Sequence, residues 1–321
     1  MEIVIDAFEE SIREDIRHGL EEFIAFISSR IGLDLESLEY FVVPKNFGNE
    51  VITWQEKLGL PTGYTKTSVV EAGGKLLTYR KDNMLKMTML IDSSIIGSFF
   101  NDELLRQIGA FYICHELCHV HDGSQVANML GVDFILKKET SSPAELLRIY
   151  AEGIWTEYYA SRLSAATITL PLEEEVVQEV LLFPTLMNVI EEVEAKAQEH
   201  IAKYRWHADI GRLFEEFKEL GPYLLKIASR TYGHLDGLSI PELLDSIASC
   251  ISDTYFSNIW GSLGLELQKQ FDNYPNWSSV ETLDGLANII VKTWNALGIY
   301  PDMSPSTFEN GIYVDVPWPN D

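Results

Sequence analysis

The amino-acid sequence predicts an α+β fold in which a small sheet precedes a mainly helical second half. Short apolar runs typical of strands cluster between residues 38 and 92. From about residue 101 onward, apolar residues recur at the spacing of amphipathic helices. A boundary is predicted near Thr169-Leu170-Pro171, between an α+β half and a helical half. It gives one domain over residues 1–170 and a helical domain or extension over 171–300. The proline-rich stretch 301–321 is expected to form an irregular tail.

The first half should open with an amphipathic helix over residues 6–31, where apolar side chains recur at helical spacing. A second, short helix is expected near residues 48–58. Gly73-Gly74 predicts a hairpin-like turn between two strands. The runs interpreted as strands are Tyr40–Val43, Thr67–Val70, Leu76–Tyr79 and Met87–Ile91.

The helical part should begin at Asn101, a favourable N-cap, and Gly123 is the predicted end of that helix. Ser142-Pro143-Ala144-Glu145 combines a capping box with proline at the first helical position, so the next helix should run from there to about residue 165. Further long helices are expected over 172–206, 209–230, 240–270 and 279–297.

The charge balance argues against several classes of partner. The 321 residues include 24 Lys and Arg against 49 Asp and Glu, a formal net charge of −25. Nucleic acids and anionic membrane surfaces attract Lys and Arg, so neither is expected as a partner. The start of the chain lacks the features of a signal peptide, and the three cysteines form no regular framework. We therefore expect a cytoplasmic protein.

The segment His115-Glu116-Leu117-Cys118-His119 predicts a metal site. On a helix, positions 115 and 119 lie about 40° apart, so both imidazoles can reach one ion while Glu116 lies beside it. Catalytic zinc takes three protein ligands and one water, whose pKa it lowers toward ~7. His115 and His119 are therefore predicted Zn²⁺ ligands and Glu116 the general base. The alternative interpretation is a pair of hydrogen-bonded core histidines.

Residues soon after the motif do not supply a third ligand. In one class of zinc peptidase the motif continues with a glycine and a third histidine, but Asp122 and Gln125 stand at those positions here. His121 lies about 200° around the helix from His119 and cannot easily share the ion. The third ligand is therefore expected from a later helix.

Two glutamates on the helix from residue 143 are alternatives for that ligand. Glu152 and Glu157 lie about 140° apart, so only one can face the metal. Glu152 shares its face with Arg148, its expected i,i+4 partner, which indicates a solvent-exposed face. Glu157 shares its face with small residues that allow another helix to approach. Glu157 is therefore the preferred ligand.

With these residues the chain resembles the gluzincin metallopeptidases, in which a glutamate from a following helix joins a HExxH helix. The segment Glu157-Tyr158-Tyr159-Ala160-Ser161 is similar to the E-x-x-A pattern of small cytoplasmic members, including the ImmA/IrrE-like enzymes. The resemblance covers about residues 35–165. The chain departs from the pattern at Cys118, where such motifs often hold glycine, and after residue 170, which resembles no known module.

The resemblance implies a zincin-like small sheet set against the active-site helix. It also implies zinc ligation by His115, His119 and Glu157, with Glu116 as the base in hydrolysis of a protein or peptide substrate. Two alternatives stay open: a zinc amidase acting on non-peptide amides, and a non-catalytic binding or regulatory protein with a zinc site. Glu116 discriminates against the second alternative, because a structural zinc site needs no base.

Secondary site residues are less determined by the sequence. Cys114 and Cys118 are interpreted as buried small hydrophobes, with a redox or inhibitory thiolate as the alternative. Asp122 is interpreted as a solvated acid near a helix end, or as an acceptor that orients an imidazole. The side chains that could stabilise an oxyanion in the reaction are Tyr150, Tyr158, Tyr159, His207, Tyr232 and His234.

Overall fold

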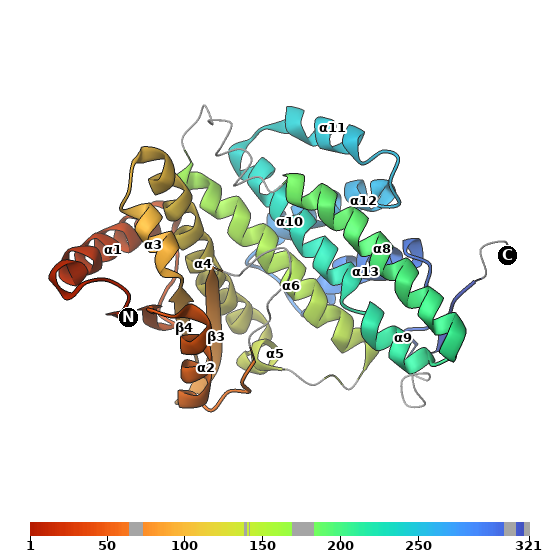
Figure 1. The fold of residues 1–321 in the computed structure, drawn as a ribbon, viewed down its shortest axis with the longest axis horizontal. Coiled ribbons are helices and arrows are strands. Elements are labelled where there is room, and N and C mark those ends of the chain that lie inside the picture. Colours follow the sequence, from red (N-terminus) through yellow and green to blue (C-terminus); the bar gives the residue numbers. More distant parts are fainter. Residues whose placement is uncertain (64–72, 138–139, 141, 169–182, 305–312, 318–321) are drawn as a thin grey trace. The chain divides into compact units, whose positions relative to one another are not determined.

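The computed structural model describes residues 1–63, 73–137, 140, 142–168, 183–304 and 313–317 (Figure 1). The chain divides into two compact units. The first comprises Met1–Lys137 and Leu163–Val180, and the second comprises Lys138–Arg162 and Leu181–Asp321. The predicted α+β class is confirmed, because a small mixed sheet accompanies a mostly helical remainder. The boundary predicted near residue 170 lies outside the described residues.

The first unit holds a four-stranded sheet in the order β1-β2-β4-β3. Strands β1 (Glu2–Ile5), β2 (Leu38–Val43) and β4 (Met84–Ile91) run parallel, and β3 (Gly74–Lys81) pairs antiparallel with β4 at one edge. The hairpin between β3 and β4 turns at Asp82-Asn83, where both residues have positive φ. Asp and Asn adopt this conformation more readily than most residues, which suits a tight two-residue turn.

One sequence prediction about this unit is wrong. A helix does not open the chain, because β1 precedes α1 (Glu10–Ile31); a strand of four residues is too short for periodicity to reveal. Gly74 is the first residue of β3 and pairs with Ile91. The run Thr67–Val70, which the predicted turn at Gly73-Gly74 would join to this strand, lies outside the described residues.

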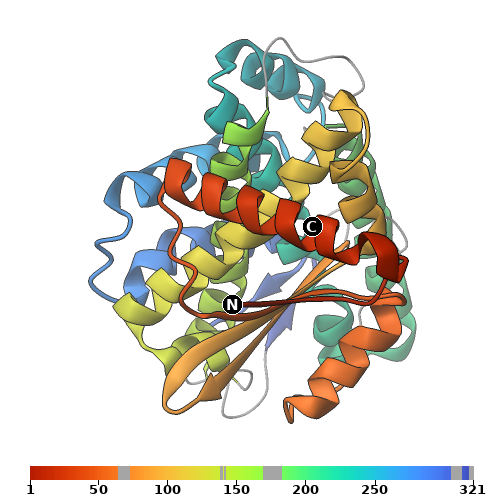
Figure 2. The ribbon, with the colours of Figure 1, turned by 90° about the vertical axis from the view of Figure 1, so that its left-hand side faces the viewer.

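Helices cover both faces of this sheet. Helix α2 (Phe47–Lys57) packs on the face that carries Leu90 and Val42. Helix α4 (Glu103–Leu130) packs on the other face, where it approaches Met87, because side chains three positions apart on a strand point to opposite sides. Helix α3 (Ser93–Phe99) contacts α4, and α1 meets α3 through the rings of Phe23 and Phe99. Figure 2 shows α1 and α2 on the two sides of the strands.

The ends of α4 differ from the prediction. Asp102 rather than Asn101 is the N-cap, since its carboxylate accepts the amide hydrogen of Leu105. Gly123 does not end the helix, which continues to Leu130 and ends at Gly131 with φ of 93°. The missing side chain at Gly123 instead leaves room for the Met87 methyl group of β4. Two short helices, α5 (Val132–Leu136) and η1 (Ala165–Thr167), complete the described part of this unit.

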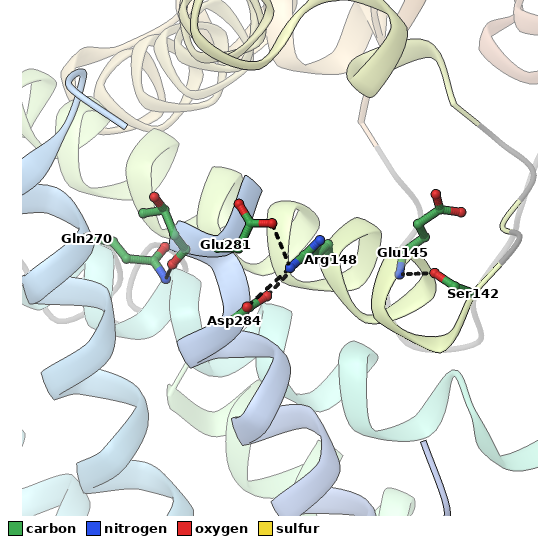
Figure 3. A network of polar contacts seen from close by, with 7 residues as sticks. Ser142, Glu145, Arg148, Gln270, Glu281 and Asp284 are labelled. Carbon is green, nitrogen blue, oxygen red and sulfur yellow. Dashed lines mark hydrogen bonds and ion pairs between the residues drawn. The ribbon is translucent and has the colours of Figure 1, made fainter. Parts of the chain in front are cut away.

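Helix α6 (Pro143–Ser164), most of which lies in the second unit, begins where the sequence predicts a helix start. The Ser142 hydroxyl accepts the amide hydrogen of Glu145 at 3.2 Å, which is half of the expected capping box (Figure 3). The other described elements are α8 (Phe183–His207), α9 (Ile210–Phe217), α10 (Leu220–Leu238), α11 (Pro241–Cys250), α12 (Ser257–Asn273), η2 (Val280–Leu283), α13 (Asp284–Ala296), β5 (Tyr300–Pro301) and β6 (Val314–Asp315).

Two predicted long helices of this unit are each divided in two. The helix expected over 209–230 is α9 followed by α10, with Pro222 in the first turn of α10, where proline is tolerated. The helix expected over 240–270 is α11 followed by α12, while η2 and α13 match 279–297. The start of the helix predicted at residue 172 lies outside the described residues. Part of the expected irregular tail pairs as the two-stranded sheet β5–β6.

None of the helices in the described part of the chain is both long enough and apolar enough to cross a membrane.

Candidate metal centre

Helix α4 brings the two motif histidines together one turn apart. His115 is buried, with 2% of its surface exposed, and the ring of His119 lies edge-on to it. Their Nε2 atoms are 3.1 Å apart. Two nitrogen ligands at about 2.0–2.1 Å from one tetrahedral zinc ion are separated by about 3.3 Å. The spacing of the two Nε2 atoms therefore suits a shared metal ion.

Glu157 of α6 is the third member of this group. His115, His119 and Glu157 each offer one ligand atom, and these atoms all lie within 4.8 Å of one another. Two imidazoles and one carboxylate form a donor set that catalytic zinc takes in proteins, with a fourth position left for water. The residues present fit a zinc ion, and they are the three that the sequence predicts as ligands.

The carboxylate of Glu116 lies against the backbone of strand β3. A Cβ atom placed on Gly74 would be only 2.5 Å from Oε1 of Glu116. Glu116 follows His115 directly on α4, so this contact fixes the side of the helix on which its carboxylate lies. Sequence reasoning did not identify Gly74, because no local pattern relates a glycine to a glutamate 42 residues later.

Glu157 has a cationic neighbour that sequence reasoning also missed. The Nε atom of Arg230 on α10 lies 3.6 Å from Oε2 of Glu157, and 17% and 24% of the two side chains are exposed. The two helices pack closely, since a Cβ atom on Gly233 would lie 2.8 Å from that of Ser161. The only available sequence signal was the small residues around Glu157, which predict a close helix without identifying it.

The structure gives Arg148 partners other than Glu152. The Arg148 guanidinium binds Asp284 at 2.8 Å and Glu281 at 3.4 Å (Figure 3). The hydrogen bond to Asp284 is the main reason that the pKa of Arg148 is raised. The predicted i,i+4 pair of Arg148 with Glu152 is therefore wrong, because α13 and η2 supply carboxylates closer to the guanidinium.

Three of the predicted oxyanion donors have their hydroxyl groups engaged within the helical unit. Tyr158 donates to Asp236 at 2.6 Å. Tyr150 donates to Glu219 at 2.6 Å, and Tyr232 donates to the backbone oxygen of Trp260 at 2.9 Å. Burial is the largest cause that raises the pKa of each of these tyrosines. Each of these three hydroxyl groups therefore donates its hydrogen to another group of the protein.

The other three predicted donors differ in their surroundings. Tyr159 is buried against the rings of Trp155 and Tyr274. His207 is exposed at the end of α8 and accepts the amide hydrogen of Asp209. His234 is fully buried on α10, one turn after Arg230. Tyr232 and His234 are therefore the two members of the six on the same helix as Arg230, the residue that contacts Glu157.

Cys114, Cys118 and Asp122 of α4 are buried. Cys114 and Cys118 are both free thiols without exposed surface, and burial together with the neighbouring Cys114 raises the pKa of Cys118 well above its usual value. This agrees with their interpretation as small buried side chains. Asp122 is fully buried, so its interpretation as a solvated helix-end acid is wrong; the helix continues for two more turns. His121 is not part of the metal-ligating group, and its Nδ1 accepts the amide hydrogen of Asp34.

No protein-family model, curated protein or solved structure matches this chain. The resemblance to gluzincins stays a prediction.

Proposed function

We propose that this protein is a zinc-dependent hydrolase that cleaves peptide bonds in a protein or peptide substrate. The observation that carries the proposal is the group of His115, His119 and Glu157, whose ligand atoms lie within 4.8 Å of one another. Three protein ligands with a fourth position for water distinguish a catalytic zinc site from a closed structural one. The choice of peptide as substrate rests on the resemblance to gluzincins.

Each residue of the site has a distinct part in the proposed reaction. A zinc ion held by His115, His119 and Glu157 would supply a water of lowered pKa and would polarise the substrate carbonyl. Glu116 would accept a proton from the water that attacks the carbonyl carbon, and it would return the proton to the nitrogen as the C–N bond breaks. One carboxylate thereby serves as base and then as acid, so no second proton carrier is needed.

Arg230 supports the ligand role of Glu157 in this proposal. A carboxylate that binds a metal is usually held in place by a second polar group. The Arg230 guanidinium, 3.6 Å from Oε2, restricts the orientation of Glu157. We assign Arg230 as a positioning residue, because it acts on the metal through Glu157.

The test compares zinc content and hydrolysis in Glu116→Gln. The variant should keep about one zinc per chain, while its rate on a pool of internally quenched peptides falls about 10²–10⁴-fold, the usual contribution of a general base. Glu103→Gln, at an exposed position in the first turn of the same helix, is the matched control and should keep both properties.

Three outcomes separate the proposal from its alternatives. Cleavage by Glu116→Gln at the wild-type rate would remove the assigned base and contradict the mechanism. Cleavage of small non-peptide amides, but of no peptide, would indicate the amidase. A zinc-loaded wild type that hydrolyses neither class would indicate a binding or regulatory protein.

A further inference from the structure

Strand β3 lies against the proposed catalytic carboxylate at a position that has no side chain. A Cβ atom on Gly74 would lie 2.5 Å from Oε1 of Glu116 and 2.7 Å from its Cγ. Non-bonded carbon atoms are at their optimal separation at about 3.5–4.0 Å. The side chain of Glu116 therefore occupies the space that any residue other than glycine would need at position 74.

Space, rather than backbone conformation, is the reason for glycine here. Gly74 is not among the glycines with positive φ, and it forms a regular antiparallel pair with Ile91. Alternation along the strand places position 74 on the same face as Leu76, which pairs with Met89 on the face that α4 covers. A side chain at position 74 would thus point toward α4 at the level of Glu116.

We infer that Gly74 is a positioning residue for Glu116, with the bare backbone of β3 holding the carboxylate beside the metal ligands on α4. The inference rests on the proposed function, since it gives the contact a role in catalysis. The contact itself lies wholly within the first compact unit, because Gly74 and Glu116 both belong to it. A methyl group at position 74 would displace the carboxylate and leave the histidines in place.

The preceding glycine offers a matched control. A Cβ atom on Gly73 would meet the terminal methyl group of Ile95, with the next carbon of that side chain at 3.4 Å. Ile95 has no part in the site, and its terminal methyl group can rotate away. Gly73→Ala and Gly74→Ala therefore make the same chemical change at adjacent positions, each against the far end of one side chain.

The experiment compares these two variants in structure and in activity. Crystal structures of the zinc-free proteins would locate the Glu116 carboxylate, which should move by about 1 Å or more in Gly74→Ala and stay in place in Gly73→Ala. Both variants should bind about one zinc per chain. On the fluorogenic peptide pool, kcat should fall about 100-fold in Gly74→Ala, with KM unchanged, because a displacement of about 1 Å can cost that much in rate.

A double variant tests the contact itself. In the Glu116→Ala background the carboxylate and its Cγ are absent, so adding Gly74→Ala should lower the residual kcat by less than threefold. Contacting residues show this non-additivity, whereas independent sites do not.

The failure of the inference is distinguishable from the failure of the proposed function. An unmoved carboxylate in the Gly74→Ala crystal, or a kcat equal to that of Gly73→Ala, would overturn the inference even in an active zinc enzyme. A wild type that binds no zinc and cleaves no peptide would overturn the proposed function. Displacement of the carboxylate in that inactive protein would still support the contact as the one that places Glu116.

Discussion

Helix α6 carries two polar clusters that begin one residue apart and differ in how their groups are paired. In the first, Tyr158 donates to Asp236 at 2.6 Å, and Arg162 donates to both Tyr158 and Gln268. In the second, Glu157 has Arg230 at 3.6 Å, longer than a hydrogen bond, and shares a group of metal-ligating atoms with two histidines.

The difference separates a structural cluster from a candidate functional one. Around Tyr158 the donors and acceptors match, and the Arg162 guanidinium also lies 3.7 Å above the ring of Phe271. Such a network supports packing. Glu157, His115 and His119 each offer an atom that could bind a metal ion, and these atoms lie within 4.8 Å of one another. Breaking the first cluster should therefore affect stability, and breaking the second should affect metal binding.

The largest expected effect on stability follows from Asp236→Ala. This change removes the acceptor of the Tyr158 hydroxyl, which is fully buried, and a charge partner of Arg162. We expect the free energy of unfolding to fall by about 1–3 kcal/mol, the usual cost of a buried donor left without its acceptor. Urea unfolding measures the loss, and zinc content should stay at the wild-type level. A loss of zinc at unchanged stability would reverse the assignment of the two clusters.

Arg230→Gln should lower zinc binding rather than the stability of the fold. Glu157 loses its charged neighbour, so zinc affinity should fall about 10–100-fold, the usual cost of removing a group that orients a metal ligand. Competition with a zinc chelator measures the affinity. Unchanged affinity would show that Arg230 does not position Glu157. Arg162→Gln, on α6 near Glu157, is the control, and it should leave the zinc affinity unchanged.

The smallest expected effect concerns a matched cluster in the first unit. Tyr79 donates to Glu39 at 2.8 Å, and burial, with the Glu39 carboxylate as a further cause, raises the pKa of Tyr79 to about 12. The unfolded chain ionises this tyrosine near pH 10, so its contribution to stability is complete below pH 10 and is lost as the pH rises toward 12.

At pH 11 the loss attributable to Tyr79 should be about 1.4 kcal/mol, because one pKa unit corresponds to that free energy. Denaturant unfolding at pH 9 and pH 11 measures it, with Tyr79→Phe as the reference. A variant whose stability falls as steeply as that of the wild type would show that other groups carry the pH dependence.

The sequence predicts the local parts of this molecule and misses those that depend on distant contacts. The HExxH spacing and the Ser142 cap each lie within one helix, so the residues alone indicate them. Arg230 lies 73 residues from Glu157 and Gly74 lies 42 residues from Glu116, so only the folded chain identifies them. Glycine often ends a helix, which is why the sequence predicts an end at Gly123. The helix continues instead, and Gly123 packs closely on Met87.

The most direct test of the account is elemental analysis of bound metal in the wild type, Glu157→Gln and Glu152→Gln. The account predicts about one zinc per chain in the wild type and in Glu152→Gln, with zinc lost from Glu157→Gln. A wild type that takes up no zinc, or a Glu157→Gln variant that holds it as tightly as the wild type, would contradict the proposed metal centre.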